Sequence, residues 1–269
     1  ETFDVTEYGA DAEGGADATD AFQAAIDAAA DAGGGVVFVP SGLYKCDGLL
    51  TVNGSHIVVR GEGPDHSKIY FTRHSDMTGK SHLSFVSSPQ AVTELPLVAD
   101  GVPRSRDVFV DDASILSPGD DVSLGWVITD EFVAAHGMTG TWAAFNGAWQ
   151  IFFRGQVAEV HLDEEPNRVV LDVPLRYPAL MSDSASLKKE QGYLEEVGLE
   201  HLALSNAVGW DAAWANARAP VAQFSGGKDS WMLTVAAFES PLPPSGGTGA
   251  NAHLQTAGCR IPAPNPGPG

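Results

Sequence analysis

The residues best suited to chemistry in this sequence are aromatic, and they concentrate in two stretches. Trp side chains bind sugars because the C–H groups of a pyranose ring pack against the aromatic face while its hydroxyls bond to polar neighbours. The first stretch is poor in charge and contains Trp126, Trp142, Phe145, Trp149, Phe152 and Phe153. The second group consists of Trp210, Trp214 and Trp231.

Three of these tryptophans, Trp142, Trp149 and Trp214, are the predicted substrate-binding residues. Each has Gly, Ala or Asn neighbours in place of the apolar partners that a buried strand residue would have. Two alternatives stand beside this prediction. The aromatic residues would pack in the core of the segment that carries them, or they would form a protein–protein contact, since interface cores favour Trp and Phe.

Two pairs of acidic residues on predicted turns, Asp111–Asp112 and Asp120–Asp121, offer oxygen ligands for Ca2+. Calcium needs about six or more oxygens from converging segments, and a sequence does not show convergence. Ca2+ is therefore a candidate cofactor without an assigned ligand set. The eight histidines have no HxxxH or HxH spacing and the cysteines no CxxC spacing, so no transition-metal site is predicted.

The two cysteines, Cys46 and Cys259, permit one disulfide that would tie an early strand to the C-terminal tail. Two free thiols are the alternative. Asn53-Gly54-Ser55 is an N-glycosylation sequon on a predicted tight turn, so Asn53 is a candidate glycosylation site in a eukaryotic secretory pathway.

The composition excludes two classes of partner. Acidic residues outnumber basic residues by 35 to 15, which gives a formal net charge of −20. Nucleic acid and anionic membranes bind surfaces on which Lys and Arg displace counterions, so neither is expected as a partner. No run approaches the roughly 18 apolar residues that would span a bilayer. The sequence also begins without a signal peptide, in strand-like residues, which is typical of a mature secreted protein; an engineered segment would begin in the same way.

The elements that must position these residues begin with a helix predicted over 20–32. Its apolar residues repeat at helical spacing and form one face: Phe22, Ala25, Ile26, Ala29 and Ala30. Asp17 and Asp20 favour its N-terminus, and Gly33–Gly35 favour its end. Short strands rich in β-branched residues follow at 36–39, 49–52, 57–60 and 69–71. One helix before many short strands, apolar on both sides, favours a solenoid of parallel strands whose open end the helix covers.

The first 70 or so residues resemble the N-terminal signature of the pectate-lyase superfamily, a likeness specific for fold rather than activity. The matching elements are Phe3–Gly9, Asp17–Asp20, Phe22–Ala30, Gly33–Gly35, Val36–Tyr44 and Val58–Gly63. This domain also forms the N-terminal part of polygalacturonase-like enzymes, rhamnogalacturonases, certain glucanases and phage tailspikes. The resemblance implies an all-β fold, a right-handed parallel β-helix with an N-terminal capping α-helix and, by similarity of the run from Asp112 to Val122, a small antiparallel β insert.

Four segments are predicted on this basis. They are the cap and first coils (1–103), the antiparallel insert (104–185), the resumed coils (186–245) and a Pro/Gly-rich tail or linker (246–269). Because a complete relative would have more coils, the chain is expected to be a module of a longer protein or a shortened β-helix whose open end meets a partner.

The resemblance also implies catalytic chemistry. Pectate lyases use carboxylates that hold calcium and an Arg or Lys base that removes a proton next to a uronate carboxylate. The candidates for these roles in the resumed coils are Asp211, Asp229, Lys228 and Arg218, with solvated surface charge as the alternative. The Gly-His-Gly and Arg-x-Lys motifs of polygalacturonases are not in the sequence.

Two functional classes follow. The first is a secreted carbohydrate-active protein, a lyase or glycoside hydrolase whose extracellular polysaccharide lies along the parallel sheet beside the aromatic residues of the insert. The second is a non-catalytic structural or adhesive module that binds glycans or self-assembles, with further modules beyond the tail. A cleft in which carboxylates converge beside a basic residue would favour the enzyme.

Overall fold

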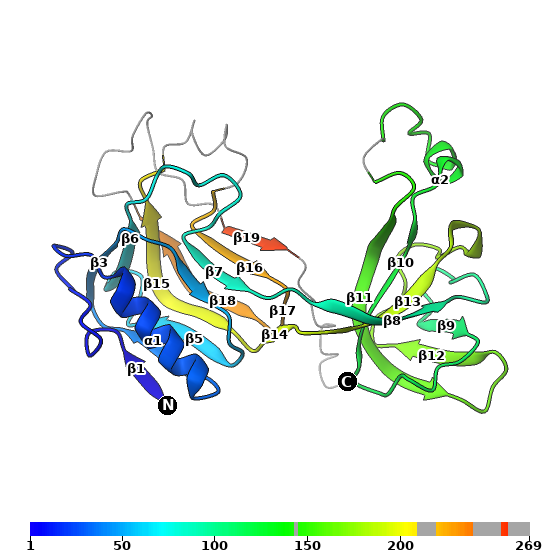
Figure 1. The fold of residues 1–269 in the computed structure, drawn as a ribbon, viewed down its shortest axis with the longest axis horizontal. Coiled ribbons are helices and arrows are strands. Elements are labelled where there is room, and N and C mark those ends of the chain that lie inside the picture. Colours follow the sequence, from blue (N-terminus) through cyan, green and yellow to red (C-terminus); the bar gives the residue numbers. More distant parts are fainter. Residues whose placement is uncertain (143–144, 209–218, 239–253, 258–269) are drawn as a thin grey trace. The chain divides into compact units, whose positions relative to one another are not determined.

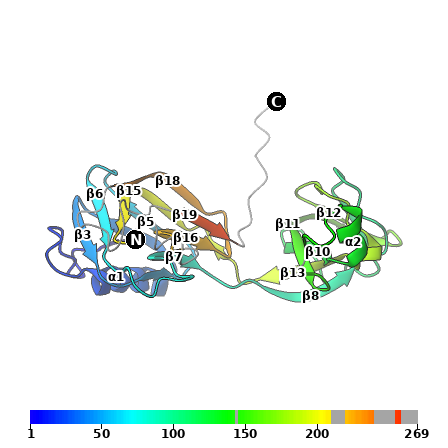
Figure 2. The ribbon, with the colours of Figure 1, turned by 90° about the horizontal axis from the view of Figure 1, so that it is seen from above.

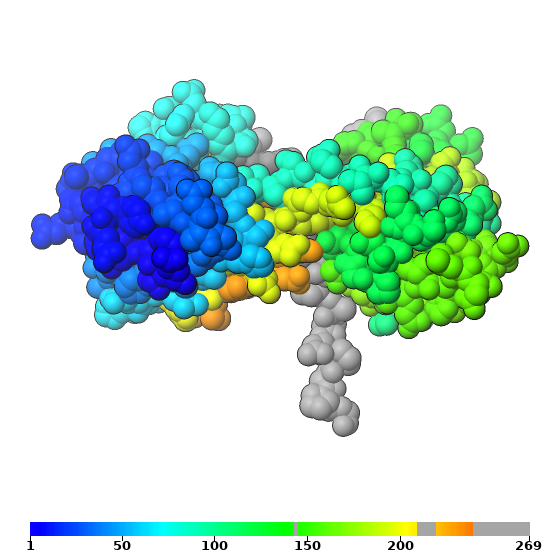
Figure 3. All heavy atoms as spheres, turned by 60° about the horizontal axis from the view of Figure 1, so that its bottom comes forward, coloured from blue at the N-terminus to red at the C-terminus, as the bar shows by residue number. Residues whose placement is uncertain are grey.

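The computed structural model describes residues 1–142, 145–208, 219–238 and 254–257. The chain forms two compact units, each with its own core. Unit 1 combines residues 1–88 with the described residues from Tyr193 to Ala257, and unit 2 consists of residues 89–192. On the face drawn in Figure 3, the N-terminal residues (blue) form a continuous surface of unit 1.

Unit 1 is a right-handed parallel β-helix, the handedness that crossovers between parallel strands adopt. Every ladder between its strands is parallel in the described part of the chain. The strands are β1 (Thr2–Asp4), β2 (Gly35–Val39), β3 (Gly42–Cys46), β4 (Leu50–Val52), β5 (Ile57–Gly61), β6 (Ser67–Phe71), β7 (Leu83–Val86), β14 (Leu194–Glu195), β15 (Gly198–Asn206), β16 (Ala222–Ser225), β17 (Gly227–Lys228), β18 (Trp231–Ala237) and β19 (Leu254–Ala257).

Successive coils of unit 1 contribute to three main ladders. The first stacks β1, β2, β5 and the beginnings of β15 and β18. The second stacks β3, β6 and the ends of β15 and β18, and the third stacks β4, β7, β16 and β19. β15 and β18 pass from the first ladder to the second at His201 and Thr234, whose φ values are 52° and 54°. The left-handed conformation at these two residues makes the corner.

The helix α1 (Thr19–Asp31) packs its apolar face against the first coils, outside the strands (Figures 1 and 2). Phe22 and Ile26 are buried in the same core as the inward-facing Val37, and each such side chain contributes about 1.5–3 kcal/mol on burial. Asp17 Oδ1 accepts hydrogen bonds from Thr19 N at 2.9 Å and Thr19 Oγ1 at 2.6 Å, which fixes the turn into the helix. The predicted helix is present; that it caps the solenoid stays a prediction.

Unit 2 is a small closed antiparallel barrel. Its strands are β8 (Gln90–Pro96), β9 (Asp107–Val110), β10 (Asp121–Val127), β11 (Trp149–His161), β12 (Asn167–Leu171) and β13 (Ser186–Gln191). They pair in the order β8-β13-β10-β11-β12-β9, and a bridge between Leu97 and Val110 joins the two ends of the sheet. The bridge brings the two ends of the sheet together beyond the end of β8, and the interior is filled by apolar side chains such as Leu124 and Val169. The helix α2 (Asp130–Ala135) and the 3-10 turn η1 (Met181–Asp183) connect its strands.

The predicted fold class is confirmed, including the antiparallel insert, but unit 2 is wider than the predicted range 104–185. β8 belongs to it because Gln90 pairs with Gln191 at the start of the β8–β13 ladder. A strand also lies within the segment expected to be a tail: β19 pairs in parallel with β16. The rest of that tail lies outside the described residues. Within the described part of the chain, no helix is long and apolar enough to cross a membrane.

Candidate functional site

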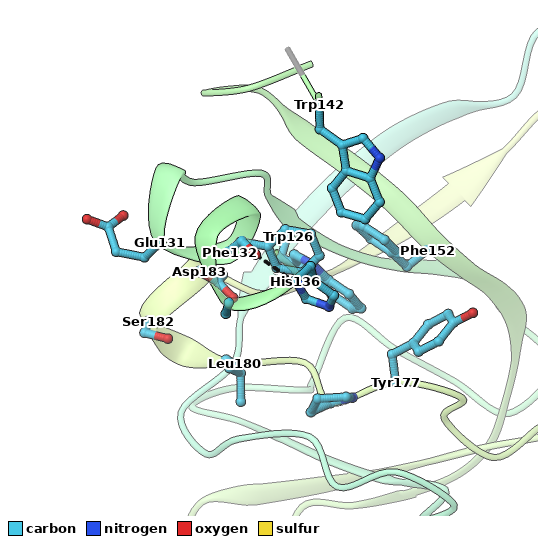
Figure 4. Close-up of a pocket in the computed structure, with 12 residues that line it drawn as sticks. Trp126, Glu131, Phe132, His136, Trp142, Phe152, Tyr177, Leu180, Ser182 and Asp183 are labelled. Atoms are coloured by element: carbon cyan, nitrogen blue, oxygen red, sulfur yellow. Dashed lines mark hydrogen bonds between the residues drawn. The ribbon is translucent and has the colours of Figure 1, made fainter. Parts of the chain in front are cut away.

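A cavity of about 550 Å3 opens on unit 2 (Figure 4). Strands β10 and β11 supply two of its side chains, α2 and the turns after it supply others, and the segment before β13 supplies the rest. The lining residues are Trp126, Glu131, Phe132, Ala135, His136, Trp142, Phe152, Tyr177, Pro178, Leu180, Ser182 and Asp183.

The floor of the cavity is a stacked pair of rings. Trp126 is buried and lies parallel to Phe152, with ring centroids 3.8 Å apart and an interplanar angle of 5°. Phe132 lies 6.3 Å from Trp142, and Trp142 is 41% exposed. In Figure 4, the rings of Trp142, Phe152 and Tyr177 lie on the same side of the labelled residues, away from Glu131. Flat, partly exposed aromatic faces of this kind can stack against sugar rings.

The side chain of Thr129 holds α2 against the segment before β13. Its Oγ1 accepts a hydrogen bond from Phe132 N at 2.9 Å, which caps the helix, and donates one to Asp183 Oδ1 at 3.0 Å. Asp183 is only 6% exposed, so the link is sheltered from water. This double contact fixes the positions of Phe132 and of His136, one helical turn later.

The polar groups of the cavity flank its aromatic walls. His136 Nδ1 lies 2.7 Å from the carbonyl oxygen of Phe132, and because a carbonyl only accepts, Nδ1 carries the proton (dashed line in Figure 4). The neutral imidazole therefore has an acceptor at Nε2. The carboxylate of Glu131 points away from the rings in Figure 4, and Ser182 and Asp183 lie on the opposite segment.

A second cavity of about 490 Å3 adjoins the first. The two share Phe132, Trp142 and Phe152, so these rings separate one cavity from the other. The remaining lining residues of the second cavity are Ile128, Thr141, Phe145, Gln150 and Ile151. Phe145 is 66% exposed and has a positive φ of 71°, an uncommon conformation for a bulky residue.

Comparison with known proteins identifies the scaffold that carries this barrel. Residues 2–93 match the family model described as rhamnogalacturonase A/epimerase, pectate lyase-like. The N-terminal coils of unit 1 thus resemble those of pectate-lyase-like proteins. The resemblance expected from the sequence is thereby confirmed.

Proteins with similar sequences include two of Azotobacter vinelandii. Mannuronan C5-epimerase AlgE2 is 41% identical over 85 residues, which cover 29% of this chain and 8% of the epimerase. Alginate lyase 7 is 39% identical over 85 residues, 29% of this chain and 10% of the lyase. Among solved structures, the tailspike gp61 of Pseudomonas phage phi297 has a TM-score of 0.57 and 16% identity, over 88% of this chain and 38% of the tailspike. The chain thus spans only a small part of these curated relatives, and the tailspike supports the fold alone.

The structure separates the three predicted substrate-binding tryptophans. Trp142 lines both cavities. Trp149 lines neither cavity: its indole N–H is buried, and Lys188 Nζ lies 3.8 Å from the centroid of its ring. Its exposure was overestimated because Gly and Ala neighbours do not reveal a cation from another strand. Trp214 lies outside the described residues.

Three other residues that line the first cavity, Phe132, His136 and Tyr177, were not predicted from the sequence. Phe132 and His136 are four residues apart, on one face of a helical turn, with ring centroids 4.2 Å apart. This spacing of four residues was the sequence feature that could have predicted that the two rings lie together. Tyr177 lies far along the chain, and no local pattern connects it to α2.

The four predicted catalytic residues do not form a described cluster. Lys228 is buried, and its Nζ lies 2.6 Å from Glu195 Oε1, because the parallel pairing of β14 with β17 places the two residues side by side. Such an ion pair is typical of a structural contact rather than of a base. Asp229 follows at a left-handed turn with φ 50°. Asp211 and Arg218 lie outside the described residues, so the catalytic assignment stays a prediction.

Another buried carboxylate lies on the first ladder of unit 1. Glu200 accepts hydrogen bonds from Arg60 Nε and from Trp231 Nε1, both at 2.6 Å. Burial alone would raise the pKa of Glu200, but these two donors outweigh it and hold the pKa below the ordinary value. Both oxygens are thus occupied by protein donors, which indicates a structural role.

The predicted acid pairs do not fit a calcium site. Asp112 accepts a hydrogen bond from Ser114 N at 2.8 Å, and Asp120 pairs with Lys189 at 2.7 Å. The described residues contain no group of three or more His, Cys, Asp or Glu side chains that could hold a metal ion.

Two predicted modification sites remain. Asn53 is exposed on the turn after β4, where its side chain is accessible. Cys46 is buried in the core of unit 1, and burial raises the pKa of its thiol. Cys259 lies outside the described residues, so the disulfide stays a prediction.

Proposed function

We propose that this chain belongs to a secreted carbohydrate-active enzyme, a polysaccharide lyase or glycoside hydrolase, and that the aromatic cavity of unit 2 binds its extracellular polysaccharide. The observation that carries the proposal is Trp142, a partly exposed indole above a cavity whose rim offers hydroxyl, carboxylate and imidazole groups. Aromatic faces bind the C–H side of a sugar ring, and polar groups at their edges bind its hydroxyls.

The relatives support this proposal independently of the cavity. The two Azotobacter vinelandii proteins are, by name, an epimerase of mannuronan and a lyase of alginate. We therefore infer that the β-helix here also serves a protein that acts on a polysaccharide. The names of these relatives favour the enzyme over the non-catalytic structural module.

The residue types needed for either reaction line the cavity. A lyase needs a base that removes a proton next to a carboxylate, and the acceptor Nε2 of His136 is such a group. A hydrolase needs a pair of carboxyl groups, and Glu131 and Asp183 line the same cavity.

The proposal is tested by titrating the purified chain with neutral and acidic oligosaccharides in a calorimeter. The substitution Trp142→Ala should weaken binding about tenfold, equivalent to ~1.4 kcal/mol, because the stacking face is lost. Tyr8→Ala is the matched control, since Tyr8 is 37% exposed in unit 1. Equal affinity of Trp142→Ala and the unsubstituted chain for every oligosaccharide would overturn the proposed binding site.

The reaction is assayed in the same samples by following unsaturated-uronate absorbance and reducing ends together. New absorbance identifies a lyase, whereas reducing ends without absorbance identify a hydrolase. Glycan binding without either product would leave the binding site in place and contradict the assignment as an enzyme.

A further inference from the structure

The charges around the two cavities indicate which glycan they accept. In the first cavity, the ionisable lining side chains among the described residues are Glu131, His136, Tyr177 and Asp183, and none is Lys or Arg. The lining of the second cavity contains no ionisable side chain in the described part of the chain. Arg176, next to Tyr177 in sequence, does not line either cavity.

The basic residues on the barrel strands are paired with acids elsewhere. Lys188 pairs with Glu94 at 3.2 Å, and Lys189 pairs with Asp120 at 2.7 Å. The other two pairs are Arg154 with Glu190 at 3.4 Å and Arg168 with Glu164 at 2.8 Å. A sugar carboxylate entering either cavity would therefore lose water without gaining a cation, which costs several kcal/mol.

The walls favour apolar substituents. Both cavities are lined mainly by Trp, Phe, Ile, Leu and Pro side chains, so methyl and acetyl groups on a sugar ring would be buried against carbon.

We propose that unit 2 selects an uncharged glycan with apolar substituents, such as acetamido groups, and binds successive sugar units in its two adjoining cavities. The inference rests on the proposed function in its glycoside hydrolase form and names its substrate class, because an uncharged glycan has no carboxylate next to which a lyase removes a proton. Trp142, Phe132 and Phe152 belong to both cavities, so one glycan can contact these rings from both sides. The relatives named for mannuronan and alginate act on polyuronates, and the specificity proposed for this chain differs from theirs.

Calorimetry with four probes tests the inference: the tetramer of N-acetylglucosamine, the tetramer of glucose, a tetramer of mannuronate, and free N-acetylglucosamine. The acetylated tetramer should bind at least about tenfold more tightly than each of the other three, a difference of ~1.4 kcal/mol. Equal or tighter binding of mannuronate would overturn the preference for an uncharged glycan. Equal binding of the glucose tetramer, which is uncharged and has no acetamido group, would overturn the role of that group, and equal binding of the monosaccharide would overturn the paired cavities.

A charge reversal at the cavity sharpens the test. Glu131→Lys should increase mannuronate affinity about threefold to tenfold, because it places a cation where the cavity now has an acid. Asp130→Lys is the matched control, since Asp130 lies on the same helix, is exposed and does not line a cavity. Equal gains in both variants would mean that only overall charge matters, and the selection by the cavity would be wrong.

The two proposals fail in different ways. If mannuronate binds best and Trp142→Ala removes that binding, the glycan site stands and only its specificity is overturned. If no oligosaccharide shows binding that depends on Trp142, the proposed function itself is overturned.

Discussion

Aromatic side chains have opposite roles in the two units. In unit 1, Phe22, Tyr44 and Phe71 are fully buried, and Phe85 stacks on Phe224 with ring centroids 4.3 Å apart, so the rings fill the interior between the ladders. In unit 2, Trp142 and Phe145 are exposed, as is Tyr177 at 50%. The same residue class thus fills the core of unit 1, whereas in unit 2 several of its members line cavities and are exposed. Aromatic content by itself does not indicate a sugar site.

The two units also differ in how far they are covered by similarity to known proteins. The matched family segment, residues 2–93, covers the first coils of unit 1 and ends within β8, the first strand of the barrel. The likeness therefore identifies the scaffold. The cavities lie in the part of the chain beyond it, and their chemistry must be argued from their own residues.

The largest contrast is expected in stability. Phe85→Ala should lower the free energy of unfolding by about 3–5 kcal/mol, because it leaves a cavity in the core of unit 1. Phe145→Ala should change it by less than about 0.5 kcal/mol, since this ring is exposed in unit 2. Urea denaturation measures both. Equal destabilisation by the two substitutions would contradict the difference between core and surface aromatics.

A smaller effect is expected at the buried carboxylate of unit 1. Glu200→Gln should cost about 1–3 kcal/mol at neutral pH, because Arg60 then faces no charge and one acceptor is weakened. The folded-state pKa of Glu200 lies below the unfolded value, so its contribution is complete above the unfolded pKa and is lost as pH falls through the folded pKa. The difference in urea midpoint between the two proteins should therefore shrink below about pH 4.

The control for that substitution is Glu196→Gln. Glu196 is exposed and pairs with His56, so its replacement should change stability by less than about 0.5 kcal/mol. A pH-independent loss in Glu200→Gln would show that shape rather than ionisation matters at this position.

The smallest effect separates the two predicted tryptophans of unit 2. Trp149→Phe should lower the free energy of unfolding by about 0.5–1 kcal/mol, because the contact with the Lys188 ammonium is weakened. Glycan affinity should stay within about twofold, a change of ~0.4 kcal/mol, in contrast to Trp142→Ala. A loss of glycan affinity comparable to that of Trp142→Ala would contradict this prediction and indicate that Trp149 contacts the glycan.

The sequence was informative where local pattern and structure agree. The apolar period of Phe22, Ile26 and Ala29 predicted α1 to within a residue, and the short β-branched runs predicted the parallel strands around it. The barrel was less visible, because β8 reads as a continuation of the coils and joins unit 2 only by pairing with β13, almost a hundred residues on.

The sequence predicted the type of residue at the candidate site, an exposed tryptophan, but not the cavity that surrounds it. Trp142 could be singled out from its small neighbours, but its cavity depends on the contact of Thr129 with Asp183, which are 54 residues apart. Trp149 shows the reverse case, since its local sequence suggested exposure and the cation of another strand covers it. Tertiary contacts between distant segments determine whether each of these tryptophans is exposed at the cavity. Such contacts cannot be predicted from the spacing of neighbouring residues.

The way the barrel joins the β-helix has a consequence for the evolution of specificity. Its first and last strands pair at Gln90 and Gln191, and in the β-helix Ser87 Oγ accepts a hydrogen bond from Leu194 N at 3.1 Å, so the chain leaves and re-enters the coils at nearly the same point. The stacking of the coils therefore depends little on the inserted segment. Each doubling of the length of an inserted loop adds only about 0.6 kcal/mol to the free energy of loop closure. Exchange of the whole barrel for another insert would leave the parallel ladders of the β-helix unchanged, and the glycan specificity proposed for the barrel would change with it.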